Sequence, residues 1–297
     1  MELYLVMVAL MLVAFLITYL TSRILSSKVL AMIRGNGDDR RRGHRGYSPN
    51  YRGKNVTFPG GLVFVAGCAI VVTVAVFGGF DETREFLGYL TSLFGFAFVG
   101  LVDDMFSDDN SGFKGHLGSL FRDDMMTTGT YKLFLGGTVA LAASALLADG
   151  FLEVLMHTGI ICLSANLSNL ADTRPGRTAK FAMAFTFIAL SLWIVLDRAD
   201  VIVNGFNSFF TLSVTLGGLL GTLHLELREQ MMLGDTGSNA VGAVIGYSIC
   251  LIPNTAVEVS MLVILAVLNV LSEKVSFTKV IEEVPVLRFI DELGRKR

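Results

Sequence analysis

Three acidic residues stand at the ends of apolar stretches, where carboxylates could hold a divalent cation. Asp103 and Asp104 follow one stretch, and Asp235 lies within Gly234-Asp235-Thr236-Gly237-Ser238. A carboxylate there is costly unless water, a cation or a metal ion compensates it. Neighbours on a helix point about 100° apart, so Asp103 and Asp104 cannot form one clamp. An Asp near hydroxyls at a helix N-terminus suits a cation and its phosphate, although a solvated helix end or a plain N-cap would explain these acids too.

A second group of polar residues recurs every three positions. Asn166, Asn169 and Asp172 have a spacing that places them along one face of a helix. This arrangement suits the binding of a polar ligand at the end of a membrane-spanning helix. Hydrogen bonds between neighbouring helices are the alternative.

Four basic residues are candidates for contacts with phosphate. Arg174 and Arg177 flank a Pro-Gly pair that ends the preceding helix, and their guanidinium groups match phosphate oxygens. Lys54 precedes a Gly-Gly turn at the start of an apolar run, and Lys114 follows the paired aspartates. Both lysines could present a charge to a bound phosphate.

The elements that carry these side chains are apolar runs of membrane-spanning length. The chain has 297 residues, of which 53% are hydrophobic and 17% are charged, whereas a soluble domain has about 25% charged residues. This composition excludes a water-soluble globule, a disordered chain and a collagen-like chain. It predicts an all-α polytopic membrane protein with about nine transmembrane helices of roughly 20 residues. The predicted spans are 3–25, 61–79, 86–102, 131–148, 151–168, 178–196, 201–223, 236–252 and 255–272.

Lys and Arg residues are divided unequally between the two sides of these spans. Only Arg84 and Arg198 lie on one side, and the other side holds 22 of the 24 basic residues. The positive-inside rule therefore predicts an N-terminus outside and a cytoplasmic C-terminus. Connections on the outer side are short, so we expect the active site at the cytoplasmic face. The basic-rich segments are 23–60, 103–132, 169–180, 224–235 and 273–297.

These spans predict a single polytopic transmembrane domain over 1–272. Its cytoplasmic active-site loops are expected at 26–60, 103–130, 169–180 and 224–235. Apolar residues at helical spacing in 273–297 predict a cytoplasmic amphipathic helix, on the membrane surface or covering the site. The three cysteines fall inside apolar runs, which predicts no disulfide framework. No feature predicts binding of nucleic acid.

Four segments, in this order, resemble the polyprenyl-phosphate N-acetylhexosamine-1-phosphate transferase superfamily (glycosyltransferase family 4). This superfamily includes phospho-MurNAc-pentapeptide translocase and undecaprenyl-phosphate GlcNAc-1-phosphate transferases. The resemblance covers roughly residues 50–250. The matching segments are Lys54 to Gly61, Asp103-Asp104, Asn166-x-x-Asn169-x-x-Asp172 and Gly234-Asp235-Thr236-Gly237-Ser238.

The resemblance implies transfer of a sugar-1-phosphate from a nucleotide-diphosphate sugar, of the UDP-N-acetylhexosamine type, to a polyprenyl phosphate. The reaction would start an envelope glycan at the cytoplasmic face of the bacterial inner membrane. Asp103, Asp104 and Asp235 would be catalytic, with Mg²⁺, or Mn²⁺ as the alternative, on Asp235 and Asp104. Family members often form homodimers, but no dimer face is evident in the sequence. The implied substrate-binding residues are Lys54, Lys114, Asn166, Asn169, Asp172, Arg174 and Arg177.

The chain departs from the family pattern in two segments. Asp172 is followed by Thr173-Arg174-Pro175-Gly176 in place of Asp-Gly-x-Asp-Gly, so the uridine pocket is altered or replaced. The histidine-rich segment and the tenth span are not found, and we expect Arg174 and Arg177 to replace those histidines in phosphate binding. The main alternative is a non-catalytic relative that binds polyprenyl phosphate. A transporter is disfavoured because the polar groups gather at one face of the membrane.

Overall fold

A computed structural model describes most of the chain and confirms the all-α class. Its described residues are 2–35, 47–50, 52–53, 55–57, 60–78, 83–107, 128–196 and 205–295. Within these ranges the chain forms eleven helices and a single two-stranded hairpin. Helices therefore supply almost all the regular structure of the described residues.

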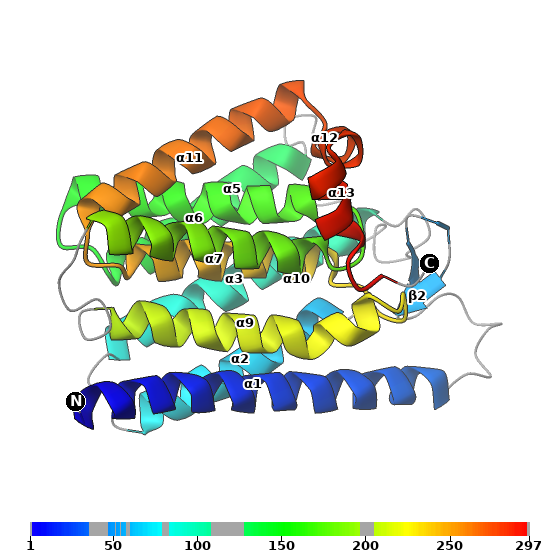
Figure 1. Cartoon of the computed structure of the whole chain (residues 1–297), viewed down its shortest axis with the longest axis horizontal. Helices are drawn as coiled ribbons and strands as arrows, with labels where there is room; N and C mark the ends of the chain where they lie inside the picture. The colour runs from blue at the N-terminus through cyan, green and yellow to red at the C-terminus, as the bar shows by residue number, and fades with distance from the viewer. Residues whose placement is uncertain are drawn as a thin grey trace.

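Nine of the helices are long and lie side by side along the long axis of the molecule (Figure 1). Seven of them are long and apolar enough to cross a membrane, which confirms a polytopic membrane protein. We predict spans for α5 and α10 as well, but their apolar stretches are shorter. The number of spans and their orientation remain predictions. The nine helices are α1 (Glu2–Gly35), α2 (Gly60–Phe77), α3 (Thr83–Ser107), α5 (Thr128–Ala145), α6 (Phe151–Ala171), α7 (Arg177–Leu196), α9 (Phe206–Glu226), α10 (Gly234–Cys250) and α11 (Thr255–Lys274).

Helix α1 is longer than the predicted span 3–25. It continues to Gly35, so residues 26–35 of the expected loop 26–60 are helical. The apolar pattern continues through Leu30, which is buried against Leu225 and Met231 near the end of α9. Burial of this apolar side chain stabilises the additional turns.

Helix α10 lies at the centre of the bundle. It contacts α2, α3, α5, α6, α7 and α9, and Asp235 is its one residue that is not buried. Small residues allow this close packing: a Cβ atom at Gly242 would overlap the backbone of α6. The acid of the central helix, Asp235, is therefore half-buried at its N-terminus, surrounded by the ends of neighbouring helices.

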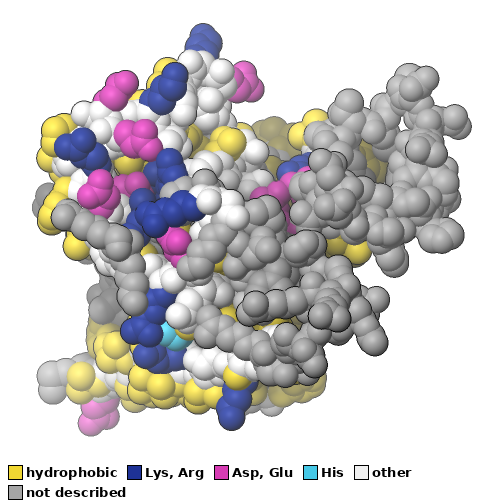
Figure 2. Space-filling view, turned by 90° about the vertical axis from the view of Figure 1, so that its right-hand side faces the viewer, with side chains coloured by type: hydrophobic (Ala, Val, Ile, Leu, Met, Phe, Trp, Pro, Cys, Tyr) yellow, Lys and Arg dark blue, Asp and Glu magenta, His cyan; other side chains and the backbone are white. Residues whose placement is uncertain are grey.

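Strands β1 (Tyr47–Pro49) and β2 (Asn55–Thr57) form an antiparallel hairpin at one end of the bundle. The hairpin is tied to the chain that enters α10, because the backbone N–H of Met232 donates to the carbonyl of Thr57 at 3.0 Å. We call this end of the molecule, on the right in Figure 1, the hairpin end. Figure 2 looks onto it and shows its charged side chains beside hydrophobic ones at the rim.

The C-terminal segment forms two short helices, where we expected one amphipathic helix over 273–297. After α11 the chain forms α12 (Phe277–Glu283) and α13 (Pro285–Glu292), both at the hairpin end (Figure 1). Val284 adopts an extended conformation because a residue before proline disfavours the helical region. Pro285 then starts α13 at a position where its missing N–H costs nothing.

Candidate active site

The C-terminal end of α3 meets the N-terminal end of α10, and Asp104 joins the two helices. Its Oδ1 atom accepts a hydrogen bond from the backbone N–H of Asp235 at 2.9 Å. Its Oδ2 atom accepts from the backbone N–H of Thr236 at 2.8 Å and from the hydroxyl of Thr236 at 2.6 Å. The first amides of a helix have no partner within the helix, and the helix dipole favours a negative charge beside them. Asp104 thus caps α10 from a neighbouring helix and fixes the position of Asp235.

Asp103, Lys132 and Asp235 lie together beside this cap. Lys132, in the first turns of α5, forms an ion pair with Asp103, and its Nζ atom lies 3.7 Å from Oδ2 of Asp235. The carboxyl groups of Asp103 and Asp235 also interact with each other, and the nearby Asp103 disfavours the charged form of Asp235. We call Asp103, Asp104, Lys132 and Asp235 the acidic cluster, since it contains three acids and one cation.

The pKa of Asp235 is raised to about 8. Burial disfavours its charged form most strongly, and the neighbouring Asp103 and Asp104 add to the effect, whereas Lys132 opposes it. Asp235 stands at the hairpin end, one residue before the predicted span 236–252. A strongly raised carboxyl pKa with specific charged neighbours is typical of functional sites.

Two glycines allow the acidic cluster to form. A Cβ atom at Gly100 in α3 would overlap the backbone of Asp235 and Thr236, so only glycine lets these helix ends touch. Gly234 has a φ of +70° directly before Asp235, a conformation that other residues rarely adopt. The approach of Asp103 and Asp104 to α10 therefore depends on both glycines.

Asn166 and Asn169 contact different neighbours, although they share the C-terminal half of α6. Asn166 donates a hydrogen bond to Asn269 of α11 at 2.7 Å. Asn169 accepts one from the hydroxyl of Ser238 in α10 at 3.1 Å. Asn169 therefore lies towards the first turns of α10, while Asn166 makes the interhelical bond that was the alternative for this motif.

Asp172 and Glu226 line a cavity of about 210 Å³ beside the acidic cluster. Asp172 accepts a hydrogen bond from the hydroxyl of Thr178 at 2.8 Å, and Glu226 accepts one from the backbone N–H of Gly176 at 3.0 Å. The other carboxylate oxygen of Glu226 has no hydrogen-bond partner among the described residues. The pKa of Asp172 is raised well above its ordinary range by loss of hydration and by nearby Glu226. The other lining residues are Asn50, Val56, Thr173, Arg174, Pro175, Glu229, Met231 and Met232.

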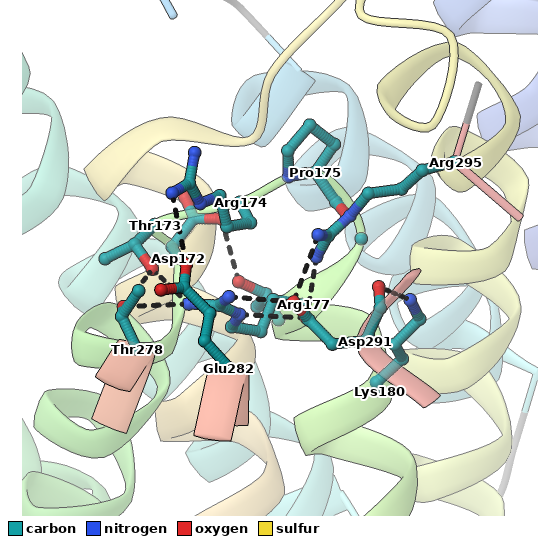
Figure 3. Close-up of polar contacts among 12 residues, drawn as sticks. Asp172, Thr173, Arg174, Pro175, Arg177, Lys180, Thr278, Glu282, Asp291 and Arg295 are labelled. Carbon is teal, nitrogen blue, oxygen red and sulfur yellow. Dashed lines mark hydrogen bonds and ion pairs between the residues drawn. The ribbon is translucent and has the colours of Figure 1, made fainter. Parts of the chain in front are cut away.

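Arg174 and Arg177, which we expected to bind phosphate, are held by the C-terminal helices (Figure 3). The guanidinium of Arg177 donates to both carboxylate oxygens of Asp291 at 2.9 and 2.8 Å, and the residue is 5% exposed. Arg295 donates to the same carboxylate. Arg174 lies 3.4 Å from Glu282, nitrogen to oxygen. We call Arg177, Asp291 and Arg295 the arginine clamp, since it fastens α13 to the start of α7.

Lys54 and Lys114, the other expected phosphate ligands, lie outside the described residues. Lys132 is the basic residue that the structure brings to the acidic cluster. The sequence offered one signal for it, a single cation in the first turn of an apolar run on the same side as the acids. In the sequence, Lys132 contributes only to the unequal distribution of basic residues between the two sides, because no local pattern connects it to Asp103 or Asp235.

Glu226 is a second site residue that the sequence analysis missed. Glutamate side chains are rarely fully buried, yet Glu226 is 4% exposed. It lies at the last position of α9. An acid at the end of an apolar run is the signal that could have singled it out. Its neighbour Gly176 is 50 residues away in the sequence, so the contact itself depends on the tertiary fold.

The donor atoms of the acidic cluster fit Mg²⁺ through Asp103 and Asp235. Within the described ranges, three or more His, Cys, Asp or Glu residues are nowhere grouped so as to hold a metal ion. Mg²⁺ needs fewer, because one or two carboxylates commonly hold it together with water and substrate phosphates. Asp104, which we expected as a ligand, has both oxygens engaged by α10. Its observed contacts are those of a helix cap.

Comparison with known proteins gives distant similarity to one kind of enzyme. A phospho-N-acetylmuramoyl-pentapeptide-transferase of Desulforamulus reducens is 26% identical over 231 residues, which are 73% of this chain and 67% of that protein. The enzyme of the same name from Campylobacter hominis is 26% identical over 222 residues, 67% of this chain and 61% of the relative. That of Campylobacter lari is 25% identical over 207 residues, 63% of this chain and 58% of the relative.

The chain thus spans about three fifths to two thirds of the length of the curated relatives it matches. No protein-family model matches the chain. The acidic motifs, the helical membrane fold and the three relatives nevertheless agree with one another. This agreement supports a distant relationship of the chain to the polyprenyl-phosphate N-acetylhexosamine-1-phosphate transferase superfamily.

Proposed function

We propose that the protein transfers a sugar-1-phosphate from a nucleotide-diphosphate sugar to a polyprenyl phosphate, with Mg²⁺, at the cytoplasmic face of a bacterial inner membrane. The acidic cluster carries this proposal, because Asp103, Lys132 and Asp235 converge at the mouth of the bundle. The names of the three relatives support the same chemistry. The donor is of the UDP-N-acetylhexosamine type, and its product starts a cell-envelope glycan.

In this reaction an oxygen of the lipid phosphate attacks the sugar-linked phosphorus of the donor. A new phosphorus–oxygen bond forms, and the bond to the bridging oxygen breaks, so the nucleoside monophosphate leaves with the bond electrons. Mg²⁺ bound at Asp103 and Asp235 would supply charge stabilisation to the diphosphate. The lipid phosphate is largely ionised at neutral pH, so positioning contributes more than removal of a proton.

The residues of the chain divide this work. Lys132 lies between Asp103 and Asp235, where its ammonium group can hold a phosphate oxygen beside the two acids. Asp104 keeps Asp235 in place through the backbone of α10. Because these groups belong to helices, their positions are set before the substrates bind, which lowers the cost of reaching the transition state.

The cavity beside Asp172 is the proposed site for the nucleotide end of the donor. Its volume of about 210 Å³ and its polar walls suit a base or a ribose. Asn169 accepts a hydrogen bond from Ser238 in the first turns of α10, the helix that carries Asp235. We therefore keep Asn169 and Asp172 as substrate-binding residues, whereas Asn166 acts through its contact with α11.

A non-catalytic relative that binds polyprenyl phosphate is the second candidate function. It is favoured by the engagement of Arg177 in the arginine clamp, which leaves this guanidinium no free face for phosphate. Lys132 and the acids could bind a lipid phosphate with a metal ion without transferring a sugar. The two candidates differ in whether label from a donor enters the lipid.

The experiment combines purified protein, undecaprenyl phosphate, Mg²⁺ and a panel of labelled UDP-sugars. We expect label in the lipid fraction for at least one donor, and loss of that label with Asp235→Asn. Asp149→Asn is the matched control, since it makes the same substitution at an exposed residue between α5 and α6. Lipid binding without transfer from any donor would instead support the non-catalytic candidate.

A further inference from the structure

The side chains of α13 have the reverse of the usual arrangement for a helix packed on a protein. Asp291 is its one buried residue, at 8% exposure. Val286 and Phe289 are each 67% exposed, and Leu287, Ile290 and the following Leu293 are exposed as well. A surface helix in water normally turns its apolar side to the protein and its charges outwards. Something other than water is therefore expected against the apolar side of α13.

Polar contacts hold this helix to the bundle. The carboxylate of Asp291 pairs with Arg177 and Arg295, and its backbone carbonyl accepts a hydrogen bond from Lys180 at 2.5 Å. Arg295 also donates to the carbonyl of Pro175 at 2.8 Å. These contacts fix which side of α13 faces the protein, so its apolar side stays exposed.

Exposed apolar side chains also lie on the long helices next to the C-terminal segment. Lys180, which binds α13, is followed along α7 by the exposed apolar residues Met183 and Phe187. Helix α11, which precedes α12, exposes Val267 and Val270 in the same way. Figure 2 shows hydrophobic side chains along part of the rim of the hairpin end. Helices long and apolar enough to span a bilayer therefore end close to α13.

We propose that α13 lies in the bilayer interface, with Val286, Phe289 and Ile290 among the upper acyl chains. The occupant of this surface is the lipid bilayer itself. Arg288 and Glu292 lie on the opposite side of the helix by their spacing, and both are exposed, so they face the headgroups and water. A short helix with one apolar and one charged side is the usual form of an interfacial anchor.

The anchor is connected to the segment that carries Asp172. Arg177 of the arginine clamp donates to the hydroxyls of Thr173 and Thr278, at 2.5 and 3.0 Å, besides Asp291. Residues 172–177 are thereby fastened to a helix whose depth the membrane sets. We infer that α13 positions the wall of the Asp172 cavity relative to the lipid surface. Its interfacial location does not depend on the proposed transferase activity.

Tryptophan fluorescence in liposomes tests the location directly. Trp193, the single tryptophan, is buried, so Trp193→Phe gives a dark background into which Phe289→Trp is placed. Arg288→Trp is the matched control, because it puts the reporter on the adjacent residue of the charged side. Lipids brominated near the headgroup should quench the residue 289 reporter at least roughly threefold more than the residue 288 reporter, and iodide in the buffer should do the opposite.

Equal quenching of the two reporters by brominated lipid would overturn the proposal. Protection of the residue 289 reporter from both lipid and iodide would also overturn it, because a second copy or another protein would then cover this side. Val286→Trp is a second reporter on the apolar side, which keeps the test decisive if Phe289→Trp does not fold. Neither readout uses sugar transfer, so failure here and failure of the proposed function are distinguishable.

Discussion

The acidic cluster and the arginine clamp lie at the same end of the bundle but treat their charges in opposite ways. In the arginine clamp, Asp291 accepts hydrogen bonds from Arg177 and Arg295, and every acceptor oxygen of the carboxylate is engaged. In the acidic cluster, one lysine pairs with Asp103 and lies 3.7 Å from Asp235, so two carboxyl groups face a single cation. The charges of the arginine clamp are fully paired within the protein, whereas the acidic cluster has more carboxyl groups than its one cation can neutralise.

The pKa values follow this contrast. Burial opposes ionisation of Asp291, but the hydrogen bonds from Arg177 and Arg295 outweigh it and lower the pKa to about 2. Burial also raises the pKa of Asp235, and there the neighbouring acids reinforce it, to about 8. An ion-pair network whose charges are all paired stabilises the fold. A cluster with unpaired acidic groups is suited to bind a charged ligand. Substitutions in the two clusters should therefore affect different properties.

The largest effect is expected from Asp235→Asn. Loss of this carboxylate should lower sugar-1-phosphate transfer by roughly 10³-fold, about 4 kcal/mol, because it removes charge stabilisation from the reaction. The midpoint of unfolding should stay the same or rise, because an amide needs no proton to lie beside Asp103. Transfer is measured as label in the lipid fraction, and unfolding by titration with denaturant.

Asp149→Asn should leave both measurements unchanged, since this residue is exposed and lies between α5 and α6. An Asp235→Asn variant that unfolds early would contradict the contrast, because it would make the acidic cluster a structural network too.

The next largest effect is expected from Arg177→Met. This change leaves Asp291 with only Arg295 in a buried setting, and breaking a buried ion pair costs about 3 kcal/mol of unfolding free energy. The double variant Arg177→Met, Asp291→Leu should recover part of that loss. Denaturant titrations of all three proteins check this. A loss of transfer at unchanged stability would assign Arg177 to phosphate binding after all.

The pH dependence of stability should differ in sign between Asp172 and Asp291. The folded-state pKa of Asp172 is raised above 3.8, so the folded protein keeps a proton that the unfolded chain releases, and stability falls as pH rises above 3.8. Asp172→Asn cannot ionise and should remove this slope, with a gain of about 1 kcal/mol at pH 8. Thermal unfolding between pH 5 and pH 8 measures it, and parallel curves for variant and wild type would refute it.

Asp291 gives the opposite slope. Its pKa falls from 3.8 to about 2 on folding, so its contribution to stability is present above pH 3.8 and is lost as pH falls through about 2. Asp291→Asn should therefore be destabilised at neutral pH, with a difference from wild type that shrinks on acidification. An acid-resistant difference would mean that the arginine clamp acts by shape rather than by charge.

The smallest effect is expected from Arg174→Ala. Arg174 and Glu282 are partly exposed, at 30% and 53% of their side chains, and their nitrogen–oxygen distance is 3.4 Å. Exposed ion pairs contribute about 0.5 kcal/mol or less, so the unfolding midpoint should hardly move. A loss as large as that of Arg177→Met would extend the arginine clamp to Arg174.

Much of the fold could be predicted, because the length of an apolar run depends only on consecutive residues in the sequence. The apolar runs correspond to the nine long helices, and the motif acids lie at one end of them. We expected one helix over 273–297 and missed the break between α12 and α13, although Pro285 is its local signal, because a residue before proline disfavours the helical region. The extension of α1 to Gly35 was missed, because it depends on burial of Leu30 against residues far along the chain.

The candidate site was harder to predict, because its contacts join distant segments. Asp103 and Asp235 could be chosen from their motifs, but Lys132 could not be connected to them. Arg177 looked like a phosphate ligand, yet its partner Asp291 lies 114 residues further along. Sequence spacing indicates which groups share a helix face, and it says little about which helix faces them.

The cap that Asp104 places on α10 has an evolutionary consequence. The side chains of the acidic cluster are borne by the ends of α3, α5 and α10, which the bundle holds together. Neighbouring segments such as 172–177 can then change in sequence while the acids keep their places. Selection for a new donor can act on residues around the acidic cluster without moving the cluster itself. Proteins with low sequence identity can therefore retain the same acidic groups.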